Sequence, residues 1–146
     1  MSFGGKPMTS VATSEAKDAK LLVETSAIVA IILEEPDWRE LTAKIESSRC
    51  QTTSINVFKA VLALAKTRGT PSLAHDAARK FMEESGIEIV AVTLEMIPHA
   101  VHARERYGRG RNALNMGDCL SYGAAKQLGL TLLYKGDDFA ATDVND

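Results

Sequence analysis

The sequence predicts a single α/β domain built on a central parallel sheet of about four to five strands, with helices on both faces. Short apolar segments alternate along the chain with longer amphipathic segments. Such alternation is typical of βαβ units, in which a helix connects two parallel strands. A chain of 146 residues with 45% hydrophobic and 25% charged residues is large enough to bury one core.

The amino-terminal segment differs in composition from the rest of the chain. Gly, Ser, Thr, Ala and Lys dominate residues 1–19, and apolar residues do not recur there with a regular period. A segment of this composition cannot bury enough apolar surface to fold by itself. We therefore expect a flexible tail over residues 1–19 and the folded domain over residues 20–146.

Strands are expected where short runs with strand-forming residues are bounded by turn or helix signals. The expected strands are 20–23, 50–53, 87–92 and 130–134. Helical patterns separate them, so a parallel sheet brings their carboxyl ends to one edge. That edge is where open α/β sheets bind ligands.

Helices are expected where apolar residues recur at three- and four-residue spacing. Trp38, Leu41 and Ile45 share one such face, and Pro36 ends the helix before them. Pro98 is tolerated because it falls in the first turns of its helix. The expected helices are 25–34, 37–47, 54–68, 73–85, 94–107 and 116–128.

Charge, cysteine content and hydropathy exclude several classes of protein. A net charge of −2 gives no global signature of nucleic-acid binding, so any RNA contact must come from a local patch. Cys50 and Cys119 match neither a zinc spacing nor a disulfide framework, and free thiols indicate a reducing cytoplasm. No apolar run is long enough for a membrane span, and no signal peptide is apparent, so we expect a cytoplasmic protein without membrane contact.

Carboxylates occur at the points where such a sheet presents side chains to a ligand. Glu24 follows the first expected strand, Asp118 begins a helix, and Asp137 and Asp138 follow the last strand. Gathered carboxylates repel one another unless a cation joins them, and Mg²⁺ or Mn²⁺ suits oxygen ligands. We predict that these four residues are catalytic, with Glu24, Asp118 and Asp137 as metal ligands. Each also has a purely structural explanation as a helix-end or turn residue.

Three motifs resemble PIN-domain ribonucleases, and together they resemble the VapC toxins of bacterial toxin–antitoxin pairs. They are Val23-Glu-Thr-Ser-Ala27, Gly117-Asp-Cys-Leu-Ser-Tyr122 and Leu132-Leu-Tyr-Lys-Gly-Asp-Asp-Phe139. The resemblance implies one α/β domain and Mg²⁺- or Mn²⁺-dependent endonucleolytic cleavage of RNA. It also implies a cognate VapB-type antitoxin and a homodimer.

Two positions depart from the pattern of that family. Glu24 stands where the family has an aspartate, which moves the carboxylate out by one methylene. Lys59, in Asn56-Val-Phe-Lys-Ala60, stands where the family has a glutamate. Its ammonium either reaches solvent or pairs with Asp118 or Glu24. Pairing would weaken metal binding and nuclease activity, and the alternative function is a catalytically silent PIN domain that binds antitoxin or RNA.

Hydroxyl and basic residues complete the predicted site. Thr25 and Ser26 cap a helix, and the resemblance implies that they orient metal-bound water. Arg109 and Arg111 lie in a glycine-spaced loop after Tyr107, which favours contact with an RNA backbone and stacking on a base. Arginines at a helix end are also favoured by the helix dipole alone, so both interpretations stay open.

The remaining hypotheses concern a partner and a different class of function. Apolar residues over 26–36 and 37–47, including Trp38, favour docking of an antitoxin helix there. A signalling domain of phospho-acceptor type would need an adjacent pair of acids after the first strand. Glu24 stands alone at that position, which disfavours the signalling alternative.

Overall fold

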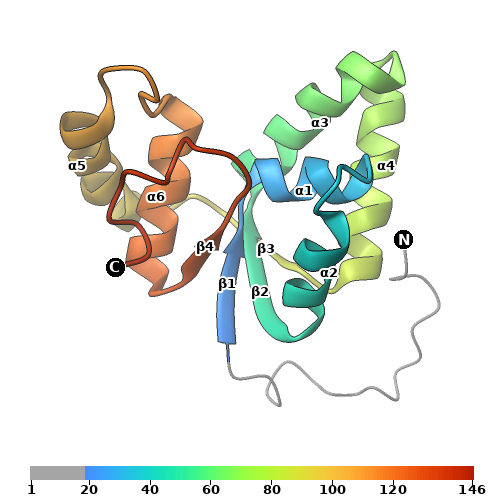
Figure 1. Ribbon diagram of the computed structural model, residues 1–146, viewed down its shortest axis with the longest axis horizontal. Coiled ribbons are helices and arrows are strands. Elements are labelled where there is room, and N and C mark those ends of the chain that lie inside the picture. Colours follow the sequence, from blue (N-terminus) through green and yellow to red (C-terminus); the bar gives the residue numbers. More distant parts are fainter. Residues whose placement is uncertain (1–18) are drawn as a thin grey trace.

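The computed structural model describes residues 19–146, which form a four-stranded parallel sheet in the order β3-β2-β1-β4 (Figure 1). The strands are β1 (Ala19–Val23), β2 (Ser48–Thr53), β3 (Glu88–Val90) and β4 (Thr131–Leu133). The predicted α/β class is therefore confirmed. Of the segment expected to be a flexible tail, residues 1–18 lie outside the described part, and Ala19 belongs to β1.

The helices agree with the sequence prediction except at some ends. They are α1 (Thr25–Ile32), α2 (Trp38–Glu46), α3 (Ser54–Arg68), α4 (Pro71–Ser85), the 3₁₀ turn η3 (Leu94–Met96), α5 (Ile97–Tyr107) and α6 (Met116–Leu128). The helix expected over 94–107 is divided, because the α-helical part begins at Ile97 and so keeps Pro98 in its first turn. Within residues 19–146, no helix is long and apolar enough to cross a lipid bilayer.

The segment between the expected helices 54–68 and 73–85 contains the start of α4. The Thr70 side chain accepts a hydrogen bond from the Leu73 N–H at 3.2 Å, and Pro71 occupies the first turn. Proline at this position loses no helical hydrogen bond, because the first N–H groups of a helix have no partner within it. The helix therefore begins two residues before the predicted position.

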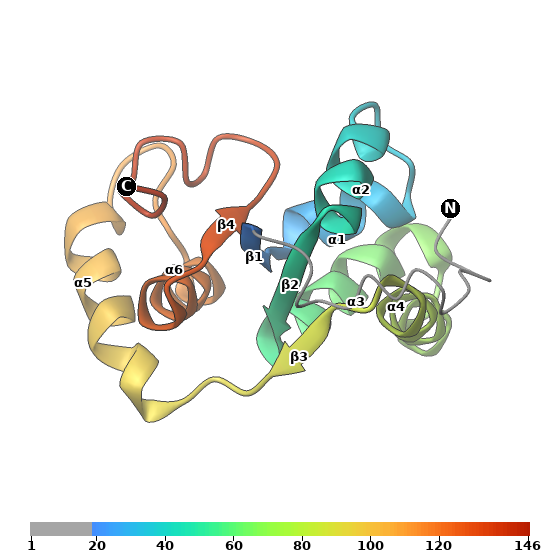
Figure 2. The same cartoon turned by 90° about the horizontal axis from the view of Figure 1, so that it is seen from below.

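The helices form a layer on each side of the sheet, α1–α4 on one and α5 with α6 on the other (Figures 1 and 2). Val23 and Leu133 pack into the core beneath α1 and α2. Leu22 and Leu132 pack into the core beneath α5 and α6. Neighbouring residues of a strand point to opposite faces, which explains why β1 and β4 each supply both cores.

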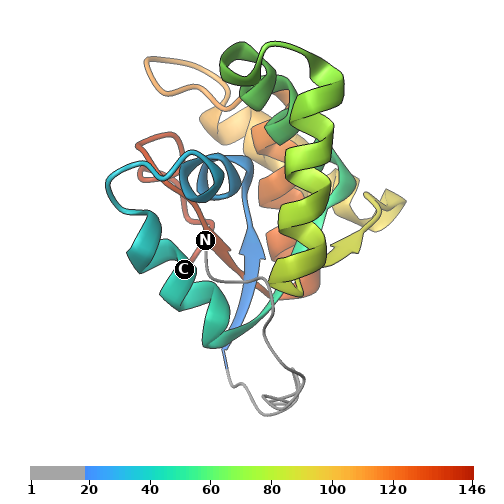
Figure 3. The ribbon, with the colours of Figure 1, turned by 90° about the vertical axis from the view of Figure 1, so that its right-hand side faces the viewer.

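The carboxyl ends of β1 and β4 lie side by side, and this register positions the site. Val23 pairs with Leu133, and the next N–H, that of Glu24, donates to the Leu133 carbonyl at 2.9 Å. Helix α1 begins directly after Glu24, and the loop after β4 passes beside the start of α1 (Figure 3). Segments more than 100 residues apart in the chain, at Ser26 and Lys135, are therefore in contact.

Candidate active site

Glu24 is the N-cap residue of α1, and its carboxylate is held under the first turn of that helix. Its Oε1 accepts hydrogen bonds from the Ser26 backbone N–H at 2.9 Å and from the Ser26 hydroxyl. Only 4% of Glu24 is exposed. Burial raises the pKa of this carboxyl, while the two Ser26 hydrogen bonds act in the opposite direction. The result is a buried carboxylate with a fixed orientation.

Asp118 lies in the first turn of α6 and forms a capping box with Asn115. The Asn115 side chain accepts from the Asp118 N–H at 2.9 Å, and Asp118 Oδ2 accepts from the Asn115 N–H at 3.1 Å. This reciprocal arrangement satisfies two backbone donors that the helix itself leaves without partners. One carboxylate oxygen is therefore used by the helix end, which leaves Oδ1 for other contacts.

Lys59 on α3 provides the cation nearest to Asp118. Its Nζ lies 3.4 Å from Asp118 Oδ1, so of the alternatives that the sequence left open, the pairing with Asp118 is present. Gly117 has no side chain, and this leaves room for the side chain of Lys59. A Cβ at that position would lie 2.5 Å from Lys59 Cδ and 2.7 Å from Nζ. Lys59 also lowers the pKa of Glu24, although less than burial raises it.

Asn56 is a buried polar residue whose role the sequence reasoning missed. It is fully buried, and its Oδ1 accepts hydrogen bonds from the Thr25 N–H at 3.2 Å, the Thr25 hydroxyl at 2.9 Å and the Ser121 hydroxyl at 3.0 Å. It thereby joins α1, α3 and α6 beneath Glu24 and Asp118. The signal available in the sequence was an asparagine on the same helical face as the apolar Ala60 and Leu64.

Asp137 and Asp138 are exposed on the loop that follows β4. Their side chains make no hydrogen bond or ion pair with another residue of the described chain. The loop itself is held at Lys135, whose backbone N–H donates to the Ser26 hydroxyl oxygen at 2.8 Å. The fold thus brings this loop to the edge where Glu24 lies, but it leaves both aspartates outside the buried cluster.

The predicted RNA-contacting residues have two different environments. Arg109 and Arg111 are exposed in the loop between α5 and α6. Tyr107 is half-buried, and its hydroxyl donates to Asp143 at 3.0 Å. The Tyr122 hydroxyl donates to the same carboxylate at 2.7 Å, and these bonds lower the pKa of Asp143. Tyr107 therefore has a structural role in holding the carboxy-terminal segment against α5 and α6.

The buried carboxylates have the right chemistry for Mg²⁺ or Mn²⁺, but protein donors and Lys59 already contact the oxygens that such an ion would need. Nowhere in residues 19–146 do three His, Cys, Asp or Glu side chains converge as a metal site. Glu24 and Asp118 are each engaged by protein donors, and the Lys59 ammonium lies against the Asp118 oxygen that the helix leaves available. A divalent ion at this oxygen would meet the positive charge of Lys59.

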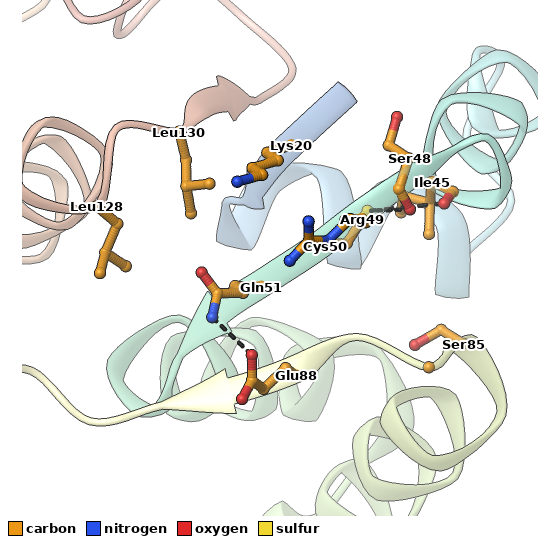
Figure 4. A pocket seen from close by; sticks show the side chains of 11 residues that line it. Lys20, Ile45, Ser48, Arg49, Cys50, Gln51, Ser85, Glu88, Leu128 and Leu130 are labelled. Atoms are coloured by element: carbon orange, nitrogen blue, oxygen red, sulfur yellow. Dashed lines mark hydrogen bonds between the residues drawn. The ribbon is translucent and has the colours of Figure 1, made fainter. Parts of the chain in front are cut away.

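A polar pocket of about 340 Å³ lies at the other edge of the sheet, where β1 and β2 begin (Figure 4). Lys20, Arg49, Gln51 and Glu88 are among its lining residues, and the Gln51 amide donates to Glu88 at 2.6 Å. None of the predicted site residues lines this pocket. The candidate active site is therefore the acidic edge formed by Glu24, Asp118 and their neighbours.

Comparison with known proteins identifies the family of this chain. The family model of the PIN domain matches residues 21–145. Ribonuclease VapC30 of Mycobacterium tuberculosis is 33% identical over 127 residues, which cover 85% of this chain and 95% of the relative. A VapC ribonuclease of Rhizobium meliloti is 34% identical over 139 residues, covering 84% of this chain and 97% of that protein. The chain belongs to the VapC ribonucleases of the PIN-domain family.

Solved structures of VapC proteins have the same fold. VapC20 of Mycobacterium tuberculosis, described as a toxin that cleaves the sarcin–ricin loop, superposes with a TM-score of 0.65. The match covers 83% of this chain and 93% of that one at 17% identity. VapBC2 of Rickettsia felis, solved with a DNA fragment from its promoter, gives a TM-score of 0.63 at 17% identity, covering 83% and 91%. By its resemblance to the named ribonucleases, this VapC-family chain is an endoribonuclease.

Proposed function

We propose that this chain is a toxin of the VapC type that cleaves RNA phosphodiesters and depends on Mg²⁺ or Mn²⁺. Glu24, Asp118 and Asp137 are the proposed metal ligands, and Asp138 is proposed as a further catalytic acid. The observation that carries the proposal is the pair of nearly buried carboxylates, Glu24 and Asp118, at the carboxyl edge of a PIN-type sheet. Acids at this edge are in the place where open α/β sheets bind ligands.

Lys59 defines the activity that we propose for the present sequence. Its ammonium neutralises part of the charge that would attract a divalent ion, and it occupies the available oxygen of Asp118. The affinity for Mg²⁺ or Mn²⁺ is therefore proposed to be low, and RNA cleavage to be slow. The Lys59–Asp118 contact equally favours the second candidate, a catalytically silent PIN domain that binds antitoxin or RNA.

RNA contact is proposed for the residues around the loop between α5 and α6. Arg109 and Arg111 are exposed there, and exposed arginines suit a phosphate backbone. Tyr107 would stack on a base only with the part of its ring left free by Arg106, whose guanidinium lies 5.6 Å from the ring centroid. Ser26 and Thr25 are proposed to orient water, and the hydroxyl of Ser26 is the one that contacts Glu24.

A VapB-type antitoxin is the proposed partner, and a homodimer is the proposed assembly. A toxin–antitoxin complex of Klebsiella pneumoniae has the same fold, with a TM-score of 0.61 at 18% identity over 87% of this chain and 94% of that one. We place the antitoxin segment on α1 and α2, where Trp38 packs against the core and Arg39 lies 4.7 Å from its ring centroid. An amphipathic helix could add apolar contacts along this surface.

The deciding experiment measures Mn²⁺ affinity by calorimetry and RNA cleavage for the natural chain and for Lys59→Glu. The substitution changes the local charge by two units within a few ångströms of Asp118, so we expect at least about tenfold tighter Mn²⁺ binding. Lys66→Glu makes the same charge change at an exposed position of α3 and serves as the matched control.

The outcomes separate the two candidate functions. Tighter Mn²⁺ binding and faster cleavage in Lys59→Glu, without either change in Lys66→Glu, support a nuclease weakened by Lys59. Equally tight Mn²⁺ binding by the natural chain and Lys59→Glu contradicts the proposed effect of Lys59. Absence of RNA cleavage in both proteins with saturating Mn²⁺ favours the silent binding module.

A further inference from the structure

The loop that carries Asp137 and Asp138 is fastened at both of its ends. On one side, the backbone N–H of Lys135 donates to the Ser26 hydroxyl oxygen at 2.8 Å. On the other side, Phe139 is 2% exposed and packs against Tyr134, with ring centroids 5.3 Å apart. The exposed aspartates therefore lie in a short loop, and the contacts at its two ends determine the position of the loop.

The attachment at Lys135 is connected to the carboxylate of Glu24. The Ser26 hydroxyl accepts from the Lys135 N–H and donates its own proton to Glu24 Oε1. A hydroxyl that accepts one hydrogen bond and donates another has a fixed rotamer, because its proton direction is no longer free. The backbone at Lys135 thus orients Ser26, and Ser26 in turn orients Glu24.

The side chain of Lys135 fastens the same loop to the connection between α1 and α2. Its Nζ lies 2.8 Å from Glu35 Oε1 in a hydrogen-bonded ion pair and 3.2 Å from Asp37 Oδ1 in a second ion pair. The hydrogen bond to Glu35 is the main cause that raises the pKa of Lys135. The loop after β4 thus contributes one positive charge to this contact, and the connection between α1 and α2 contributes two negative charges.

The end of α1 has an unusual conformation that places these carboxylates. Glu34 has φ of 52°, the one positive φ outside glycine in residues 19–146. The following N–H, that of Glu35, donates to the Ala30 carbonyl at 2.9 Å and closes the helix end. Side chains with a Cβ disfavour this region of φ, so the conformation persists because surrounding contacts hold it. The two carboxylates that contact Lys135, those of Glu35 and Asp37, follow directly after Glu34 in the chain.

We infer that Lys135 is a positioning residue that sets the Asp137–Asp138 loop relative to Glu24. Its ammonium fastens the loop to Glu35 and Asp37, and its backbone N–H fixes Ser26 on Glu24. This inference rests on the proposed function insofar as Glu24, Asp137 and Asp138 are the acids of the site. The fastening itself is independent of that function and can be measured without it.

The first measurement is amide hydrogen exchange of residues 134–138 in the full chain. Lys135→Met keeps the apolar stem and loses the charge, and we expect about two- to fivefold faster exchange, the range that a partly exposed ion pair supports. Ser26→Ala removes the acceptor of the Lys135 N–H and is expected to give the same pattern. Lys135→Arg is expected to retain protection. Lys44→Met, which removes only the exposed pair with Glu40, is the matched control.

The second measurement is RNA cleavage, with kcat and KM determined separately. A positioning role predicts a lower kcat and an unchanged KM in Lys135→Met, with recovery in Lys135→Arg. Unchanged exchange in Lys135→Met overturns the inference. Faster exchange with unchanged kcat also overturns it, because Lys135 would then hold the loop without affecting how Glu24, Asp137 and Asp138 act in RNA cleavage. If neither the natural chain nor Lys59→Glu cleaves RNA, the proposed function fails, and hydrogen exchange alone decides whether Lys135 fastens the loop.

Discussion

Lys59 and Lys135 both bring an ammonium group to carboxylates at the same edge of the sheet, but in different surroundings. Lys59 contacts Asp118 at 3.4 Å, and the side chain of Asp118 is only 5% exposed. Lys135 makes shorter contacts of 2.8 and 3.2 Å, and the side chains of Glu35 and Asp37 are 37% and 39% exposed. The longer contact is the one with the buried partner, so distance alone does not rank the two pairs.

The difference between these pairs follows from solvent screening. The side chains of Lys135, Glu35 and Asp37 are each partly exposed, so water screens their attraction and leaves a small net stabilisation, although the Asp37 Oδ1 atom itself is buried. Asp118 has little access to water, so loss of Lys59 would leave a buried charge without its cation. Lys59 therefore compensates charge inside the site, whereas Lys135 restricts where a loop lies.

The largest expected effect is the loss of stability when the ammonium of Lys59 is removed, compared with removal of the ammonium of Lys135. Lys59→Met leaves Glu24 and Asp118 without their shared cation, and we expect the free energy of unfolding to fall by about 1–3 kcal/mol. Lys135→Met is expected to cost clearly less, because all three charged groups of that cluster are partly exposed. Urea denaturation of both variants at neutral pH measures the difference, with Lys66→Met as the control on α3. Equal losses would contradict the contrast between a lysine with a buried partner and a lysine with partly exposed partners.

Gly117 offers a finer test of how closely Lys59 is fitted into the site. Alanine is favoured over glycine in helices by up to about 1 kcal/mol, so Gly117→Ala is expected to stabilise α6 when nothing obstructs the new methyl group. In the natural chain that methyl group would overlap Lys59, and the flexible side chain must move away from Asp118. The substitution should therefore be stabilising in a Lys59→Ala background and neutral or destabilising in the natural one. A double-mutant cycle by thermal denaturation measures this coupling, and strictly additive effects would refute it.

The sequence was sufficient for those features that depend on local pattern. The alternation of strands and helices predicted the sheet, and α3 and α6 have the predicted bounds because both have clear helix ends. Lys59 could be placed near Asp118 because helical spacing and the family motif put position 59 on the inner side of α3. Asn115 was also readable in principle, since asparagine three residues before an aspartate is a capping pattern.

The features that the sequence did not predict depend on contacts between distant segments. Lys135 meets Ser26 and Glu35 across about 100 residues of chain, and no local period indicates such a contact. Asn56 bonds to Thr25 and Ser121 from a third element in the same way. These side chains acquire their roles only when β1 lies between β2 and β4 in the sheet. The part that the sequence reasoning missed is therefore the network of supporting contacts, whereas the positions of Glu24 and Asp118 at helix starts could be predicted from the sequence.

The smallest expected effect is the response of the two pairs to salt. Raising NaCl from about 0.1 M to about 1 M shortens the Debye length from about 10 Å to about 3 Å, which screens exposed pairs more than buried ones. Amide exchange at 134–138 in the natural chain is therefore expected to approach that of Lys135→Met. The stability difference between the natural chain and Lys59→Met should largely remain, since Asp118 is shielded from the added ions. Loss of that difference at high salt would show that Lys59 acts from solvent, and it would remove the reason for treating Lys59 as part of the site.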